Sequence, residues 1–155
     1  MPELIPDHKS FDLAVQHVLE AEGLLSDDIR DDGGLTKYGI SQRSYPTLDI
    51  RNLTLHEATE IYRRDYWTPY HLEEFPPALA LAVFDAVVNQ GPVAISWLQR
   101  ALDLVVDGVV GPKTLHKVQE AGASPETLVT MIKEFQALRG YRYMMDDQED
   151  RKAFG

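Results

Sequence analysis

The first hydrophobic stretch of the chain follows a helical period. Phe11, Val15 and Val18 fall at i, i+4 and i+7, so they form one face of an amphipathic helix. Glu22 continues this series at i+11, directly before Gly23, a residue type that commonly ends helices. The pattern therefore predicts a helix that carries a carboxyl group on its apolar face in its last turn.

The same period recurs later and predicts a mainly α protein. Thr54 and Glu57 form a capping box before an apolar stripe, and we expect that helix to stop at Pro69. Residues 78–88 are apolar nearly all round except for Asp85, which predicts a buried central helix whose carboxylate is bonded to the backbone or to an arginine. Further helices are expected around 97–102, over 113–121 and from Ser124-Pro125 onward.

Composition limits the class of protein. The chain has 155 residues, 44% of them hydrophobic, which suits one globular body. It has no cysteine, which excludes disulfides and a thiol nucleophile. Its five histidines are scattered without metal-ligand spacing, so we expect no metal and no cofactor.

Charge and hydropathy exclude further classes. A net charge of −10 argues against nucleic-acid binding, which needs a basic patch. No stretch reaches the ~18 apolar residues of a membrane span, so stable membrane insertion is not expected. The first ten residues also lack the cationic start and apolar run of a signal peptide.

Glu22 is the first candidate for chemistry. Burial on an apolar face and the negative end of the helix dipole both disfavour the carboxylate, so both raise the pKa of this group. A carboxylic acid that stays protonated near neutral pH can protonate a glycosidic oxygen. The alternative is a surface glutamate that turns toward solvent.

The segment after Glu22 supplies the second candidate group. Asp31 and Asp32 follow nine and ten residues later, and Gly33-Gly34 then indicates a tight turn. Glycosidases commonly use a second carboxylate across the sugar. A calcium loop starting at Asp28 fails, because Arg30 would occupy a ligand position. A solvated acidic loop stays open as the alternative.

Seven motifs in this order resemble glycoside hydrolase family 108, the N-acetylmuramidases found among phage endolysins and bacterial secretion-linked muramidases. The resemblance covers about Phe11 to Tyr143 and is carried by Glu22-Gly23, Gly33–Thr36, Tyr38–Ser41, Tyr62–Trp67, Phe84–Pro92, Leu98–Leu102 and Asp107–Thr114. The last motif also resembles a peptidoglycan-binding segment, although turns between helices produce the same letters.

The resemblance implies roles for individual residues. It implies Glu22 as the general acid, assisted by Asp31 (or Asp32) and Thr36, which position water or stabilise charge. It further implies a substrate cleft lined by Asp32, Tyr38, Ser41, Tyr66, Trp67, Asn89 and Gln90. Core packing is an equal alternative for the two aromatic residues, and helix capping is an alternative for Asn89.

The resemblance also implies a fold and an organisation. We expect a mainly α, lysozyme-like single globule with a small β and loop subdomain after the first helix. The expected order is an N-terminal extension (1–10), a catalytic region (11–92), a helical peptidoglycan-binding-type region packed on it (93–145) and an acidic tail (146–155).

The implied function is that of an endolysin, which cleaves the β-1,4 bond between N-acetylmuramic acid and N-acetylglucosamine in peptidoglycan. We expect a monomer made in the bacterial cytoplasm that reaches the periplasm through a holin or an export pathway. Two alternatives stay open: a lytic transglycosylase that uses the same glutamate, and a non-catalytic wall-binding module.

Overall fold

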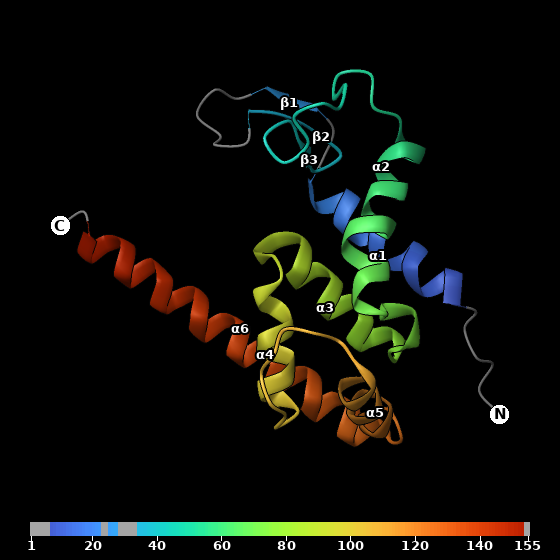
Figure 1. Ribbon diagram of the computed structural model, residues 1–155, viewed down its shortest axis with the longest axis vertical. Coiled ribbons are helices and arrows are strands. Elements are labelled where there is room, and N and C mark those ends of the chain that lie inside the picture. The colour runs from blue at the N-terminus through green and yellow to red at the C-terminus, as the bar shows by residue number, and fades with distance from the viewer. Residues whose placement is uncertain (1–6, 23–24, 28–33, 154–155) are drawn as a thin grey trace. The chain divides into compact units, whose positions relative to one another are not determined.

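The computed structural model describes the backbone of residues 7–22, 25–27 and 34–153 (Figure 1) and the side chains of 10–20 and 34–140. Contacts divide the chain into two compact units, Met1–Pro69 and Tyr70–Gly155. We describe each unit by itself.

Unit 1 contains two helices and a small sheet. Helix α1 (Asp7–Glu22) is followed by strands β1 (Leu25–Asp27), β2 (Leu35–Lys37) and β3 (Ile40–Ser41), which pair antiparallel in the order β1-β2-β3. Helix α2 (Leu55–Tyr62) continues into the π-helical segment η1 (Arg63–Trp67) and the 3-10 turn η2 (Thr68–Tyr70), which spans the boundary between the units. The expected small sheet after the first helix is confirmed.

The helical period of α1 matches its burial. Phe11, Ala14, Val15 and Val18 are all buried, whereas the intervening Asp12 and Leu13 are exposed. The ring of Phe11 contacts Trp67 edge-on, with ring centroids 5.3 Å apart. The guanidinium carbon of Arg63 lies over the Phe11 ring, 4.1 Å from its centroid. The predicted apolar face of α1 is therefore confirmed.

Helix α2 begins as expected and ends earlier than expected. The capping box is present, since Glu57 N donates to Thr54 Oγ1 and Thr54 N donates to the Glu57 carboxylate. The α-helix does not extend to Pro69, because its hydrogen bonding changes to the π pattern at Arg63. Bonds between residues five apart bring Tyr62 and Trp67 onto one side of the segment, which lets both rings be buried.

The turn between β2 and β3 is held by α2. Tyr38 and Gly39 have φ of 53° and 79°, the two positive angles that a two-residue type I′ turn requires. The Tyr62 hydroxyl donates to the Tyr38 carbonyl oxygen at 2.7 Å. Because a tyrosine at positive φ is disfavoured, this bond from the core helps to hold the turn.

Unit 2 is helical in its described part. It contains the 3-10 turn η3 (Leu72–Glu74) and the helices α3 (Pro77–Gln90), α4 (Val93–Ala101), α5 (Pro112–Ala121) and α6 (Pro125–Ala153). Helix α3 contacts α4 and α6, and α6 also contacts α4 and α5 (Figure 1). None of the described helices is long and apolar enough to cross a membrane.

The observed helices of unit 2 match the hydrophobic pattern closely. Seven residues of α3 are buried, as expected for the central helix: Leu79, Ala80, Ala82, Val83, Phe84, Ala86 and Val87. Pro112 occupies the first turn of α5, and α6 begins at Pro125. The expectation of a mainly α protein is confirmed.

A buried glutamine organises the loop between α4 and α5. The Gln99 side chain is 1% exposed, and its Oε1 accepts from the backbone N of Asp107 at 3.1 Å and of Gly108 at 2.9 Å. Its Nε2 donates to Asp107 Oδ1, to the Val109 carbonyl oxygen and to Thr114 Oγ1. The Asp-Gly turn of the peptidoglycan-binding-like motif is thus folded around Gln99.

The first prediction concerns this loop. Gln99→Met should keep the side-chain length but leave the loop amides without an acceptor, which should lower the free energy of unfolding by about 3 kcal/mol. Urea unfolding measures the effect. The matched variant Gln119→Met, at an exposed position of α5, should change stability little; equal losses in both variants would contradict the role of Gln99.

The second prediction concerns the β2–β3 turn. Tyr62→Phe should remove the hydroxyl donor to Tyr38 and cost about 1 kcal/mol in the free energy of unfolding. The control is Tyr38→Phe, because no described residue bonds the Tyr38 hydroxyl. If Tyr62→Phe unfolds at the same urea concentration as the wild type, the hydrogen bond does not stabilise the turn.

Candidate active site

The carboxyl groups at the centre of the predicted site lie outside the described residues. The backbone of α1 ends at Glu22, as the sequence predicts. The side chain of Glu22 and the whole of Asp31 and Asp32 are not described. Their roles as acid and second carboxylate stay predictions.

The sheet brings two of the predicted polar residues together. Thr36 pairs with Ser41 in the β2–β3 register, and it pairs with Ser26 of β1 on its other side. Directly paired residues of antiparallel strands project from the same face of a sheet. Both Thr36 and Ser41 are partly exposed, so one face of this small sheet presents two hydroxyl groups.

These hydroxyls already take part in local hydrogen bonds. Thr36 Oγ1 donates to the Gly34 carbonyl oxygen at 3.4 Å, and Ser41 Oγ accepts from the backbone N of Ser44 at 3.1 Å. The first bond is long and can be exchanged for another partner at little cost. Thr36 is therefore the more available of the two to a ligand or water.

Tyr38 borders a hollow of about 510 Å³ beside α1. The hollow is lined almost entirely by apolar surface, and its residues are Val15, Gln16, Leu19, Glu20, Tyr38, Leu55 and Thr59. They come from α1, from the β2–β3 turn and from α2. Its α1 wall reaches Glu20, two positions before Glu22.

The two predicted aromatic cleft residues differ in burial. Trp67 is 2% exposed and packs against Phe11, which is the core packing left open as the alternative. Tyr66 is partly exposed and lies 5.8 Å from the Tyr62 ring between centroids. The sugar contacts of both residues stay predictions, and Tyr66 has the more accessible ring.

A polar cluster that the sequence did not predict lies beside these aromatic residues. The Tyr45 hydroxyl donates to Asp65 Oδ2 at 2.6 Å, and Arg64 donates from Nε and Nη2 to both carboxylate oxygens at 2.8 Å. The bonds from Arg64 lower the pKa of Asp65; burial opposes this in part, and the bond from Tyr45 adds to the lowering. Burial and the neighbouring Asp65 raise the pKa of Tyr45.

Tyr45 and Arg64 also line a second hollow in unit 1, of about 690 Å³. Arg64 and Asp65 are adjacent in the Tyr62–Trp67 motif, and these neighbouring opposite charges are the signal of the ion pair in the sequence. Tyr45 precedes them by about 20 positions, and only the fold shows that it reaches Asp65.

In unit 2, the predicted residues Asn89 and Gln90 belong to a cluster around Arg139. Arg139 Nη1 donates to Asp85 Oδ2 at 2.8 Å, and Arg139 Nε donates to Gln90 Oε1 at 2.7 Å. Asn89 Nδ2 donates to the Asp85 carbonyl oxygen at 2.8 Å and to Asp85 Oδ1 at 3.3 Å. The expectation that Asp85 has an arginine partner is confirmed.

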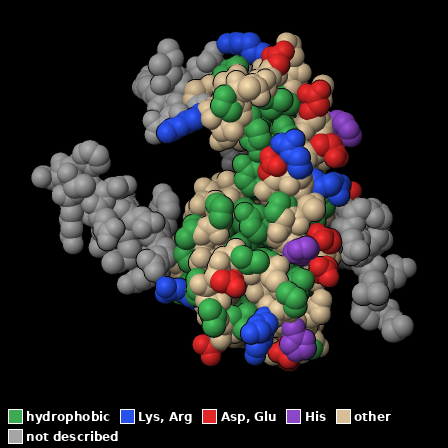
Figure 2. All heavy atoms as spheres, in the orientation of Figure 1, with side chains coloured by type: hydrophobic (Ala, Val, Ile, Leu, Met, Phe, Trp, Pro, Cys, Tyr) green, Lys and Arg blue, Asp and Glu red, His purple; other side chains and the backbone are tan. Residues whose placement is uncertain are grey.

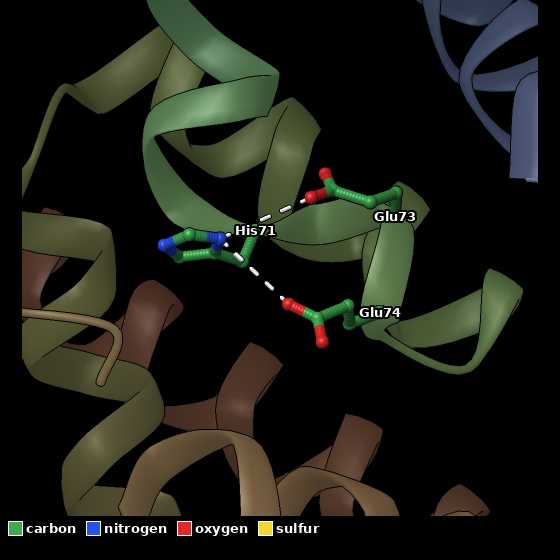
Figure 3. A group of neighbouring side chains, drawn as sticks. All are labelled: His71, Glu73 and Glu74. Carbon is green, nitrogen blue, oxygen red and sulfur yellow. Dashed lines mark ion pairs between the residues drawn. The ribbon is translucent and has the colours of Figure 1, made fainter. Parts of the chain in front are cut away.

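One group of the described residues has the composition of a metal site. His71, Glu73 and Glu74 each offer a ligand atom, and these atoms lie within 4.8 Å of one another (Figure 3). His71 Nδ1 is 3.9 Å from Glu73 and 3.7 Å from Glu74, distances that also suit ion pairs with a protonated histidine. All three side chains are at least one-third exposed, and such groups commonly lie together without an ion.

Charged side chains are dispersed over the visible face of the molecule. Figure 2 shows Lys and Arg interspersed with Asp and Glu there, and the basic groups of the described residues form no continuous patch on that face. This distribution agrees with the net charge of −10.

Comparisons with known proteins match both parts of the chain. Residues 15–91 match the family model described as Glycosyl hydrolase 108, and residues 93–154 match the one described as Predicted Peptidoglycan domain. The solved structure of SagA from Brucella abortus is 29% identical, covers 85% of this chain and 78% of its own, and has a TM-score of 0.73. No curated protein matches the chain.

The fold and these matches define a glycoside hydrolase that acts on peptidoglycan, with a mainly α fold consistent with that of lysozymes. The chain belongs to the glycosyl hydrolase 108 family and carries a predicted peptidoglycan domain after the hydrolase part. The resemblance seen in its motifs is thereby confirmed, and peptidoglycan is supported as the substrate.

The third prediction follows from the lowered pKa of Asp65. A carboxyl group with a lowered folded-state pKa stabilises the fold above its ordinary pKa of 3.8 and loses this contribution as pH falls through the folded value. Asp65→Asn should therefore be less stable than the wild type at neutral pH, by under about 1 kcal/mol because the ion pair is partly solvated.

Urea unfolding as a function of pH measures this difference, which should shrink as pH falls below 3.8. Asp12→Asn, at an exposed position of α1, is the control for loss of one negative charge. A difference between wild type and Asp65→Asn that stays constant down to strongly acidic pH would contradict the assignment.

Proposed function

We propose that the protein is an endolysin-type N-acetylmuramidase that hydrolyses the β-1,4 bond between N-acetylmuramic acid and N-acetylglucosamine. One observation carries the proposal. Helix α1 buries its apolar face, Phe11, Val15 and Val18 included, and its backbone ends at Glu22, which the sequence spacing assigns to the same face. A carboxyl group at that position suits a proton donor.

In the proposed mechanism Glu22 protonates the leaving glycosidic oxygen. Asp31 or Asp32 stabilises the positive charge that develops on the sugar, or orients the attacking water together with Thr36. The position of Thr36 on the sheet next to Ser41 supports this role, because its hydroxyl bonds only to the Gly34 carbonyl oxygen among the described residues, and that bond is long.

Several side chains are proposed to contact the glycan. Tyr38, Ser41 and Tyr66 are partly exposed in unit 1, and Asn89 and Gln90 carry amide groups in unit 2 that suit hydroxyl and acetamido groups. Trp67 would act from the core, where it packs against Phe11, rather than by stacking on a sugar itself.

We also propose that the protein is a monomer, made in the bacterial cytoplasm and active in the periplasm after passage through a holin or an export pathway. The substrate supports the periplasmic site of action, since peptidoglycan lies outside the cytoplasmic membrane.

The fourth prediction tests the acid. Glu22→Gln cannot donate a proton, so its rate of glycan cleavage should fall by about 100-fold or more. Purified Gram-negative peptidoglycan is digested with each protein and the products are identified by mass spectrometry. Asp12→Asn, in the same helix but on its exposed side, should cleave like the wild type.

The products separate the proposed function from its alternatives. Reducing N-acetylmuramic ends that depend on Glu22 would support a muramidase. Anhydro ends would instead identify a lytic transglycosylase, which forms them by internal attack. Intact glycan with the wild-type protein would contradict both reactions and leave a wall-binding module.

A further inference from the structure

Three side chains of the kinds that ligate transition metals converge on one short turn of unit 2. His71 is the residue directly before η3, and Glu73 and Glu74 belong to it. His71 Nδ1 lies 3.9 Å from Glu73 Oε1 and 3.7 Å from Glu74 Oε2, and the three ligand atoms all lie within 4.8 Å of one another. Figure 3 shows both carboxylates extending toward the same nitrogen of the His71 ring. The three groups therefore border one common space beside the turn.

The backbone that carries these side chains is held by the core. The two other residues of the segment, Leu72 and Phe75, are 0% and 5% exposed. Glu74 N donates to the His71 carbonyl oxygen at 3.0 Å, and Phe75 N donates to the Leu72 carbonyl oxygen at 3.1 Å. Because the backbone is fixed in this way, an ion would have to order only the three side chains, which lowers the entropic cost of binding it.

The distances between the ligand atoms suit a small ion after a limited adjustment. Bonds of about 2.0–2.2 Å in a tetrahedral zinc site place neighbouring ligand atoms about 3.4 Å apart. The two separations from His71 Nδ1 exceed this value by about 0.3 and 0.5 Å, and the carboxylate oxygens lie at most 4.8 Å apart. All three side chains are at least one-third exposed, so rotations about their torsions can close these gaps without disturbing the core.

The charge of the group favours a divalent cation. Among the described residues, neither Glu73 nor Glu74 forms an ion pair with a lysine or an arginine, and the partner of both is His71. One imidazole carries at most one positive charge, so it cannot offset both carboxylates. An ion of charge +2 at the common space would offset both and would relieve their mutual repulsion.

The donor set selects among the divalent ions. Calcium takes six to eight oxygen ligands and magnesium keeps an octahedral shell of oxygens, whereas an imidazole nitrogen with carboxylate oxygens suits zinc. The expectation of no metal came from the spacing of the histidines relative to one another. This group needs a single histidine, because its other two ligands are the carboxylates of the sequence His-Leu-Glu-Glu.

We propose that His71, Glu73 and Glu74 bind one Zn²⁺ ion, with water completing a tetrahedral coordination, and that the ion stabilises η3 at the start of unit 2. The inference is independent of the proposed glycan cleavage, and it gives the ion no part in that reaction.

The fifth prediction concerns zinc binding by the full chain. Isothermal titration calorimetry with zinc chloride, in a buffer that does not chelate zinc, should show one ion bound per chain at a site that needs all three ligands. His71→Asn should weaken this site by about tenfold or more, and so should Glu73→Gln and Glu74→Gln. Asparagine is chosen because it tolerates the φ of 53° at position 71.

The chain contains a matched control for a histidine beside a carboxylate. His116 Nε2 lies 2.9 Å from Glu120 Oε1 on the exposed surface of α5, and Lys117 Nζ lies 3.9 Å from the other oxygen of Glu120. This pair offers one carboxylate, which a lysine already shares. His116→Asn removes the same ring and should leave the affinity for zinc unchanged.

Stability gives a second readout. An ion that binds only the folded state stabilises it, so an excess of zinc over the chelator EDTA should raise the urea midpoint of the wild type and of His116→Asn. The midpoint of His71→Asn should not respond to zinc. Unfolding with EDTA present verifies that each variant is folded without the ion.

The remaining outcomes would overturn the inference. A wild type that binds no zinc, or a His71→Asn variant that binds it as tightly as the wild type, would mean that the three side chains form ion pairs alone. Calcium chloride that binds this group as tightly as zinc does, and without dependence on His71, would show a site made by the carboxylates and would contradict the assignment to zinc. None of these results bears on whether peptidoglycan is cleaved.

Discussion

The candidate site depends on the burial of the apolar face of α1. Phe11, Val15 and Val18 lie in the core of unit 1, and Trp67 packs against Phe11 from the end of the α2 segment. Burial of large apolar side chains is the main favourable contribution to folding. Because α1 cannot rotate without exposing these residues, the position of Glu22 at its end follows from the packing of the core.

Polar side chains then fix the turns and loops that the apolar core does not orient. Tyr62 donates a hydrogen bond to the carbonyl oxygen of Tyr38 in a turn with positive φ. Gln99 accepts hydrogen bonds from two backbone amides of the loop between α4 and α5. Arg139 similarly binds the side chains of Asp85 and Gln90 on α3. In each case a buried or partly buried group satisfies backbone or side-chain partners of an irregular segment, which apolar contacts do not orient.

The motif around Asp107 shows how one set of residues can suggest binding and have a structural role. Asp107 Oδ1 accepts from the Val109 amide and from Gln99, and these bonds lower the pKa of its carboxyl group. Gly108 adopts a φ of 75°, which its lack of a side chain permits. The Asp-Gly pair of this motif is therefore explained by the fold of the loop.

The sequence by itself determined the mainly α class, the capping box of α2, the central helix α3 and the family, because these follow from periodicity and from the order of motifs. It also indicated an arginine partner for Asp85. Only the tertiary structure decided which arginine this is, that Tyr45 reaches Asp65, and that α2 turns into a π segment which lets Trp67 be buried. These features join residues that are distant along the chain or depend on packing, and local patterns do not contain that information.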